Sequence, residues 1–121
     1  MSQMKRILLI EDDELLKELY VERLKDEFHV DIATAAGGFE GIRLIEEQKK
    51  FDLIICDINM PEGTGLDVLL HLSQTNQSIP LIFFSSNLDL KMSLRYKNLL
   101  GLIDKNNFAE LCQVVSRQID T

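Results

Sequence analysis

Acidic, hydroxyl and basic side chains follow the apolar runs of this 121-residue sequence. In chain order they are Glu11, Asp12, Asp13, Asp57, Ser85, Asp104 and Lys105. Carboxylates that converge repel one another unless a cation lies among them. Hard oxygen ligands select Mg²⁺, with water and a phosphoryl oxygen completing its coordination. A hydroxyl from Ser85 and an ammonium group from Lys105 suit a bound phosphoryl group, so the set predicts a phosphoryl-transfer site with Asp57 as the nucleophile.

The elements that position these residues follow from the apolar pattern. Short, continuous apolar runs predict five strands buried on both faces, at residues 6–10, 29–33, 53–56, 80–84 and 102–103. Amphipathic stretches follow four of them, and the first begins at Asp12 or Asp13, which are good N-caps. Its expected core-facing residues are Leu15, Leu16, Leu19, Tyr20 and Leu24. In the later helices the apolar positions are Phe39, Ile42 and Ile45, then Leu66, Leu69, Leu70 and Leu72, and finally Phe108, Leu111, Cys112, Val115 and Ile119 behind an Asn107 cap.

Residues 88–96 carry conflicting signals. Apolar and polar residues alternate there, which is typical of a strand, but the residue types are helix formers without β-branching. A parallel pair of strands also needs a crossover element, so a short or irregular helix is expected. Alternation of strands and helices then predicts an α/β fold: a doubly wound, five-stranded parallel sheet between two layers of helices.

Composition excludes several classes of function. The length suits one domain, residues 1–121. A net charge of -7 opposes binding to nucleic acid phosphates and to anionic membrane surfaces. No apolar run approaches the ~18 residues that a membrane span needs, and the N-terminus does not resemble a signal peptide, so a cytoplasmic location is expected. Cys56 and Cys112 stand alone without metal-ligand spacing, and are expected to be small core residues.

The chain resembles the receiver domain of two-component response regulators, the CheY-like superfamily, over nearly its whole length. The acid-rich end of the run at residues 6–13 and the segment 51–61, with Gly65 after it, carry the likeness. The resemblance implies a flavodoxin-like (βα)5 sandwich with strand order 2-1-3-4-5. It also implies a signalling protein rather than a classical enzyme, one that assists its own phosphoryl transfer and the hydrolysis of its aspartyl phosphate.

The resemblance assigns roles to individual residues. Asp57 would accept a phosphoryl group from a phosphohistidine on a sensor histidine kinase or a histidine phosphotransfer protein. Mg²⁺ would be held by Asp12, Asp57 and the main-chain carbonyl of Asn59, with Glu11 directly or through water. Ser85 matches the switch hydroxyl and Lys105 the lysine of the family pattern. The output protein or effector domain is not implied.

Three departures from the family pattern bear on output. Asn106 stands where a proline usually follows the lysine, Leu102 stands where an aromatic switch residue is common, and the spacing from Ser85 to Lys105 is slightly short. Because a non-proline cis bond costs about 2.5 to 4 kcal/mol, we expect a trans Lys105–Asn106 bond in a rearranged turn that still delivers the ammonium group to Asp57.

Three other functions are alternatives to a phosphoryl-accepting receiver domain. A receiver-shaped interaction module would dock partners without phosphate, through the atypical residues just named. A haloacid-dehalogenase-like phosphatase is disfavoured, because Asp57-Ile58-Asn59 follows the third strand and lacks a second carboxylate for acid–base work. A flavin binder is disfavoured because the acidic residues 11–13 would repel the cofactor phosphate.

Overall fold

The computed structural model describes residues 4–48, 50–88 and 96–119. Strands and helices alternate along this part of the chain. The elements are β1 (Lys5–Ile10), α1 (Glu14–Glu27), β2 (Val30–Ala35), α2 (Gly38–Gln48), β3 (Leu53–Cys56), α3 (Gly65–Gln74), β4 (Leu81–Ser85), β5 (Leu99–Asp104) and α4 (Phe108–Ile119). The helix expected between β4 and β5 falls largely on residues 89–95, outside the described residues. No helix of the described residues is long and apolar enough to cross a membrane.

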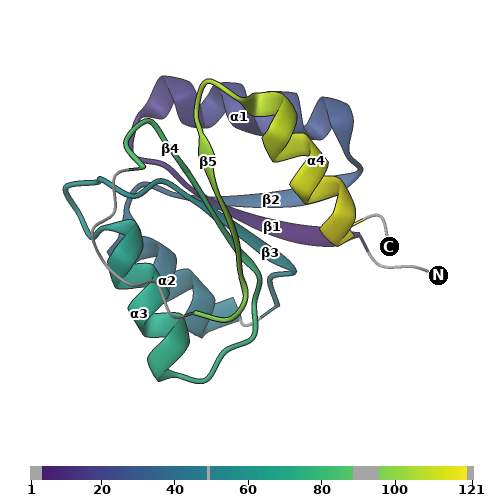
Figure 1. Cartoon of the computed structure of the whole chain (residues 1–121). Coiled ribbons are helices and arrows are strands. Elements are labelled where there is room, and N and C mark those ends of the chain that lie inside the picture. The colour runs from purple at the N-terminus through teal and green to yellow at the C-terminus, as the bar shows by residue number, and fades with distance from the viewer. Residues whose placement is uncertain (1–3, 49, 89–95, 120–121) are drawn as a thin grey trace.

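The strands form one parallel sheet in the order β2-β1-β3-β4-β5, which confirms the predicted doubly wound fold. In Figure 1, α1 and α4 cover one face of the sheet, and α2 and α3 cover the other. Alternate residues of β1 point to the two faces: Ile7 and Leu9 pack toward α1 and α4, whereas Leu8 and Ile10 pack toward α2 and α3. Burial on both faces explains why the strand sequences are continuously apolar.

The helices bury narrower faces than the sequence pattern predicts. Leu15 is 79% exposed and Leu19 is also exposed, although both were assigned to the core side of α1. The prediction is also wrong for Phe39, which is 60% exposed, and for Leu70, which is exposed as well. Each helix buries only one stripe of its surface against the sheet, so apolar residues beside that stripe remain in solvent. In α1 that stripe contains Tyr20 and Leu24.

Gly65 allows the first turn of α3 to pack closely against the loop that follows β3. A Cβ atom on Gly65 would lie 2.6 Å from the carbonyl oxygen of Asp57 and 2.8 Å from the ring of Phe83. The backbone N–H of Gly65 also donates to the carbonyl of Ile58 at 2.8 Å. The loop that carries Asp57 is therefore held against the first turn of α3.

We expect the substitution Gly65→Ala to lower the free energy of unfolding by about 1 to 3 kcal/mol, because the added methyl group overpacks a backbone contact that cannot retreat. Gly101→Ala is the matched control. A Cβ there would meet its nearest neighbour, Ile103, at an ordinary 3.9 Å. Urea unfolding of both variants checks the difference, and equal losses would show that the contact at Gly65 yields easily.

Candidate functional site

Three strand ends bring charged residues to one edge of the sheet. Glu11 follows β1, Asp57 follows β3 and Lys105 follows β5. Backbone bonds continue the sheet ladder past these ends: the N–H of Asp57 donates to Ile10 at 3.0 Å, and the N–H of Lys105 donates to Ser85 at 3.1 Å. The sheet itself therefore sets the spacing of these side chains.

Lys105 lies between two buried carboxylates. Its Nζ atom is 2.8 Å from Oε1 of Glu11 and 2.8 Å from Oδ2 of Asp57. The side chains of Glu11 and Asp57 are only 3% and 8% exposed, and that of Lys105 is 14% exposed. One ammonium group thus compensates two carboxylates that solvent barely reaches.

Both oxygens of the Asp57 carboxylate have hydrogen-bond donors. Oδ1 accepts a hydrogen bond from the backbone N–H of Ile58 at 2.7 Å, and Oδ2 accepts one from Lys105. Charge-assisted bonds of this kind are short and directional. They hold the carboxylate of Asp57 in one orientation.

The pKa values reflect burial and shared charge. Burial raises the pKa of Glu11, although hydrogen bonds from Lys105 and from the amide of Asp13 act in the opposite direction. Burial alone would lower the pKa of Lys105, but its hydrogen bonds to Asp57 and Glu11, with their charges, raise it overall. Both partners of one ion pair therefore shift upward. This is consistent, because the ammonium group gains from two carboxylates, whereas at Glu11 the effect of burial outweighs the opposing effect of Lys105.

A set of carboxylates could hold a metal ion at the same place. Glu11, Asp12 and Asp57 each offer an oxygen atom, and these atoms lie within 4.8 Å of one another. Asp12 is exposed whereas the other two are buried, so the cluster opens to solvent on one side. Hard carboxylate oxygens with room for water fit Mg²⁺. Asn59, also predicted as a ligand through its carbonyl, lies two residues beyond Asp57 on the exposed part of the loop.

Ser85 is buried at the end of β4 and its carbonyl binds the Lys105 amide. Its hydroxyl oxygen accepts a hydrogen bond from the N–H of Asn87 at 3.4 Å. In the hydrogen bonds of the described residues, Lys105 and Ile58 contact the Asp57 carboxylate and Ser85 does not. The structure brings Ser85 to the correct edge, but its hydroxyl is engaged with its own loop.

The turn after β5 agrees with the prediction made from Asn106. No peptide bond between described residues is cis, so Lys105–Asn106 is trans. Asp104 organises the turn: its side chain accepts a hydrogen bond from the N–H of Asn106 at 2.7 Å, and its carbonyl accepts one from Asn107 at 2.8 Å. Asp104 therefore shapes the turn that presents Lys105.

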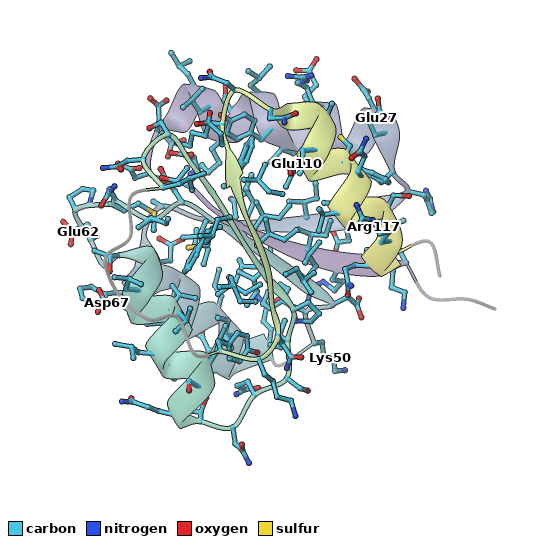
Figure 2. All side chains as sticks on the ribbon, viewed as in Figure 1. Glu27, Lys50, Glu62, Asp67, Glu110 and Arg117 are labelled. Carbon is cyan, nitrogen blue, oxygen red and sulfur yellow. The ribbon has the colours of Figure 1, made fainter. Side chains whose placement is uncertain are left out.

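Sequence reasoning also missed contacts between loops. The N–H of Gly38 donates to the carbonyl of Gly63 at 2.9 Å, and that of Phe39 donates to Glu62 at 3.1 Å, which ties the start of α2 to the loop after Asp57. Thr64 and Asp67 cap α3 reciprocally, a pattern that is visible as Thr-x-x-Asp. Figure 2 shows Glu62 and Asp67 on the same side of the molecule, beside the first turn of α3.

Known proteins resemble this chain along most of its length. The model of the response regulator receiver domain family matches residues 7–116. A similar protein is the probable C4-dicarboxylate response regulator DctR of Bacillus subtilis, 33% identical over 101 residues that cover 82% of this chain and 43% of that protein. Another is the transcriptional regulatory protein AfsQ1 of Streptomyces coelicolor, 35% identical over 71% of this chain and 37% of its own. The chain thus spans less than half the length of these relatives.

Solved structures agree with this likeness. The response regulator protein TrrA from Thermotoga maritima, in complex with Mg²⁺ and BeF, superposes with a TM-score of 0.84 at 29% identity, covering 95% of this chain and 99% of that one. The signal receiver domain of a putative Luxo repressor protein from Vibrio parahaemolyticus gives 0.83 at 30% identity, covering 98% and 92%.

Replacing Lys105 with methionine tests how far the stability of the folded site depends on one cation. Lys105→Met leaves Glu11 and Asp57 buried without a counter-charge, so we expect the free energy of unfolding at neutral pH to fall by about 3 kcal/mol. Burial already raises the pKa of Glu11, and removing Lys105 takes away the group that opposes this rise, so protonation of Glu11 favours the folded state of the variant. The loss should therefore shrink as the pH falls toward about 4.

Urea unfolding between neutral and acidic pH measures this effect. Lys17→Met is the matched control, because Lys17 pairs at 2.7 Å with Glu14, whose side chain is exposed. That pair should contribute about 1 kcal/mol or less. A loss for Lys105→Met that is no larger than the control's, or that grows in acid, would contradict the compensation argument.

Proposed function

Since the chain belongs to the response regulator receiver domain family, we propose that Asp57 accepts a phosphoryl group from a phosphohistidine of a sensor histidine kinase or a histidine phosphotransfer protein. One observation carries the proposal: the Lys105 ammonium group lies 2.8 Å from Asp57 and 2.8 Å from Glu11, in a site where three carboxylates converge. A site of this composition suits a reaction in which negative charge must be gathered and neutralised.

The reaction transfers a phosphoryl group between two nucleophiles. An oxygen of the Asp57 carboxylate attacks phosphorus, a P–O bond forms, and the P–N bond to the donor imidazole breaks. The Ile58 amide and Lys105 orient the carboxylate before attack, so little reorganisation is needed. Attack of water on the resulting acyl phosphate would return Asp57 to its starting state.

Mg²⁺ is the cation that the carboxylates would hold. Asp12 and Asp57 are the proposed direct ligands, with the main-chain carbonyl of Asn59, and Glu11 would contribute directly or through water. When bound, Mg²⁺ supplies positive charge to the oxygens of the transferring group. The likeness to TrrA, a protein solved with Mg²⁺ and BeF, supports this assignment.

Ser85 is the proposed hydroxyl donor to the phosphoryl group. Its hydroxyl lies at the same sheet edge, with its oxygen bonded to the Asn87 amide. That contact uses the oxygen as an acceptor, so the hydroxyl hydrogen would be the group that donates a charge-assisted bond to a phosphoryl oxygen. The β4 end would then move with the state of Asp57 and could pass the signal to an output protein or effector domain.

Phosphorylation with a small donor tests the proposal. Acetyl phosphate with Mg²⁺ should add the mass of one phosphoryl group to the protein, and Asp57→Asn should prevent the addition. Lys105→Met should slow the reaction, because it removes a cation from the transferring oxygens. Intact-mass spectra and peptide mapping provide the measurement. Absence of any mass shift with every donor would favour a phosphate-independent interaction module, and a shift on another residue would refute Asp57.

Mg²⁺ should also raise the melting temperature. Binding to the folded chain alone stabilises it by mass action, and Asp12→Ala should abolish the increase by removing an exposed ligand. Asp26→Ala, which changes an exposed acidic residue of α1 outside the site, is the control and should keep the increase. A melting curve that does not respond to Mg²⁺ in the parent chain would exclude the metal assignment.

A further inference from the structure

Three aromatic rings pack together on the α1 and α4 side of the sheet. They belong to Tyr20 of α1, Phe84 of β4 and Phe108 at the start of α4, and all three are buried. Tyr20 and Phe108 stack with centroids 6.2 Å apart and planes at 18°, while Phe84 meets their edges at 5.1 Å and 6.3 Å. The guanidinium group of Arg23 lies 3.9 Å from the centre of the Phe108 ring. The cluster therefore locks the first residue of α4 to α1 and β4.

This cluster is connected to Lys105 from both directions along the chain. Phe84 directly precedes Ser85, whose carbonyl accepts the hydrogen bond of the Lys105 amide. Phe108 comes three residues after Lys105 and anchors the far end of the same turn. The backbone of Lys105 thus lies between two points that the rings hold in place.

The turn itself contains no ring that would fix its direction. Asn106 leaves the φ angle after Lys105 free, unlike a proline. The hydrogen bonds of Asp104 to Asn106 and Asn107 shape the turn internally. They do not attach it to the rest of the protein. Its attachment, and with it the direction of the Lys105 side chain, depends on the bond of the Lys105 amide to Ser85 at one end and on the anchored Phe108 ring at the other.

The Tyr20 phenol also responds to the charges of the site. Burial raises the pKa of the Tyr20 phenol, the charge of Lys105 opposes this rise, and the charges of Glu11 and Asp57 add to it. The phenol therefore lies close enough to these groups to respond to them, and it stays neutral. Tyr20 therefore remains a neutral ring where it packs against Phe108 and Phe84.

We propose that Tyr20 and Phe108, with Arg23 against the Phe108 ring, are positioning residues that hold Lys105 toward Asp57 and Glu11. The consequence for the rate of phosphoryl transfer rests on the proposed function. The effect on Lys105 itself does not, and it can be measured without any phosphoryl donor.

Phe108→Leu removes the stacked ring and keeps an apolar side chain. The matched control is Phe51→Leu, which changes a buried ring that also has an arginine over it, Arg6 at 5.1 Å, at the opposite edge of the sheet. Mass spectrometry measures the rate at which a small acylating reagent modifies Lys105, at a temperature where both variants are folded. Phe108→Leu should raise that rate severalfold and Phe51→Leu should leave it unchanged. Equal rates in the two variants would overturn the proposal.

Tyr20 is tested by a conservative pair. Tyr20→Leu should raise the modification of Lys105 as Phe108→Leu does. Tyr20→Phe keeps the ring and should restore the low rate of the parent chain. If the Phe variant behaves like the Leu variant, the ring does not position Lys105 and the proposal is wrong for Tyr20.

A double-mutant cycle shows whether the rings act through Lys105. Phe108→Leu alone should slow phosphorylation by acetyl phosphate by about tenfold or more, because a small misplacement of a charged group is costly. In a Lys105→Met background the same substitution should cause no further slowing. Slowing that is additive would refute positioning through the lysine. If the parent chain takes up no phosphoryl group, the proposed function fails, and the acylation rates still decide the role of the rings.

Discussion

Compensation of buried negative charge by a single ammonium group governs the carboxyl edge of this sheet. Glu11 and Asp57 come from separate strands and would repel each other strongly if Lys105 did not lie between them. Three nearby features position the residues of this contact. The ladder bonds past the strand ends set the spacing, the Gly65 contact holds the Asp57 loop, and the Asp104 turn presents the lysine. Burying three charged groups together costs free energy of desolvation. Such an arrangement fits a site that is built to bind a metal cation and a phosphoryl group.

Much of the architecture follows from local sequence, because burial of strands on both faces demands continuous apolar runs such as Leu53–Cys56. The start of α1 also follows, because the side chain of Asp13 accepts a hydrogen bond from the N–H of Leu16. Which apolar stripe of a helix faces the sheet does not follow. Leu15 and Leu16 are equally apolar, but only the packing direction of α1 determines that the first lies in solvent.

The site likewise has features that the sequence predicts and features that it does not. Carboxylates at strand ends are visible in the sequence, because parallel strands must bring them to one edge, and Asp57 and Glu11 do meet there. The bond from Lys105 to Glu11, the loop contacts of Gly38 and the packing of Tyr20 on Phe108 join residues far apart in the chain. No local pattern encodes such contacts, since each depends on how loops and helices settle on the finished sheet. The hydroxyl of Ser85 shows a further limit, because its position along β4 is predictable and its hydrogen-bond partner is not.

The paired backbone bonds between the start of α2 and residues 62–63 have a consequence for protein engineering. Surface connections usually accept inserted residues, and they are the usual choice for circular permutation or for splitting a domain into fragments. Here an extra residue beside Gly63 would disturb its match with Gly38, although the neighbouring Pro61 and Glu62 are exposed. A reporter or a split point placed at Pro61 or Glu62 because they are exposed would therefore disturb the loop that carries Asp57, whereas a label on an exposed residue of α4 such as Arg117 would leave that connection intact.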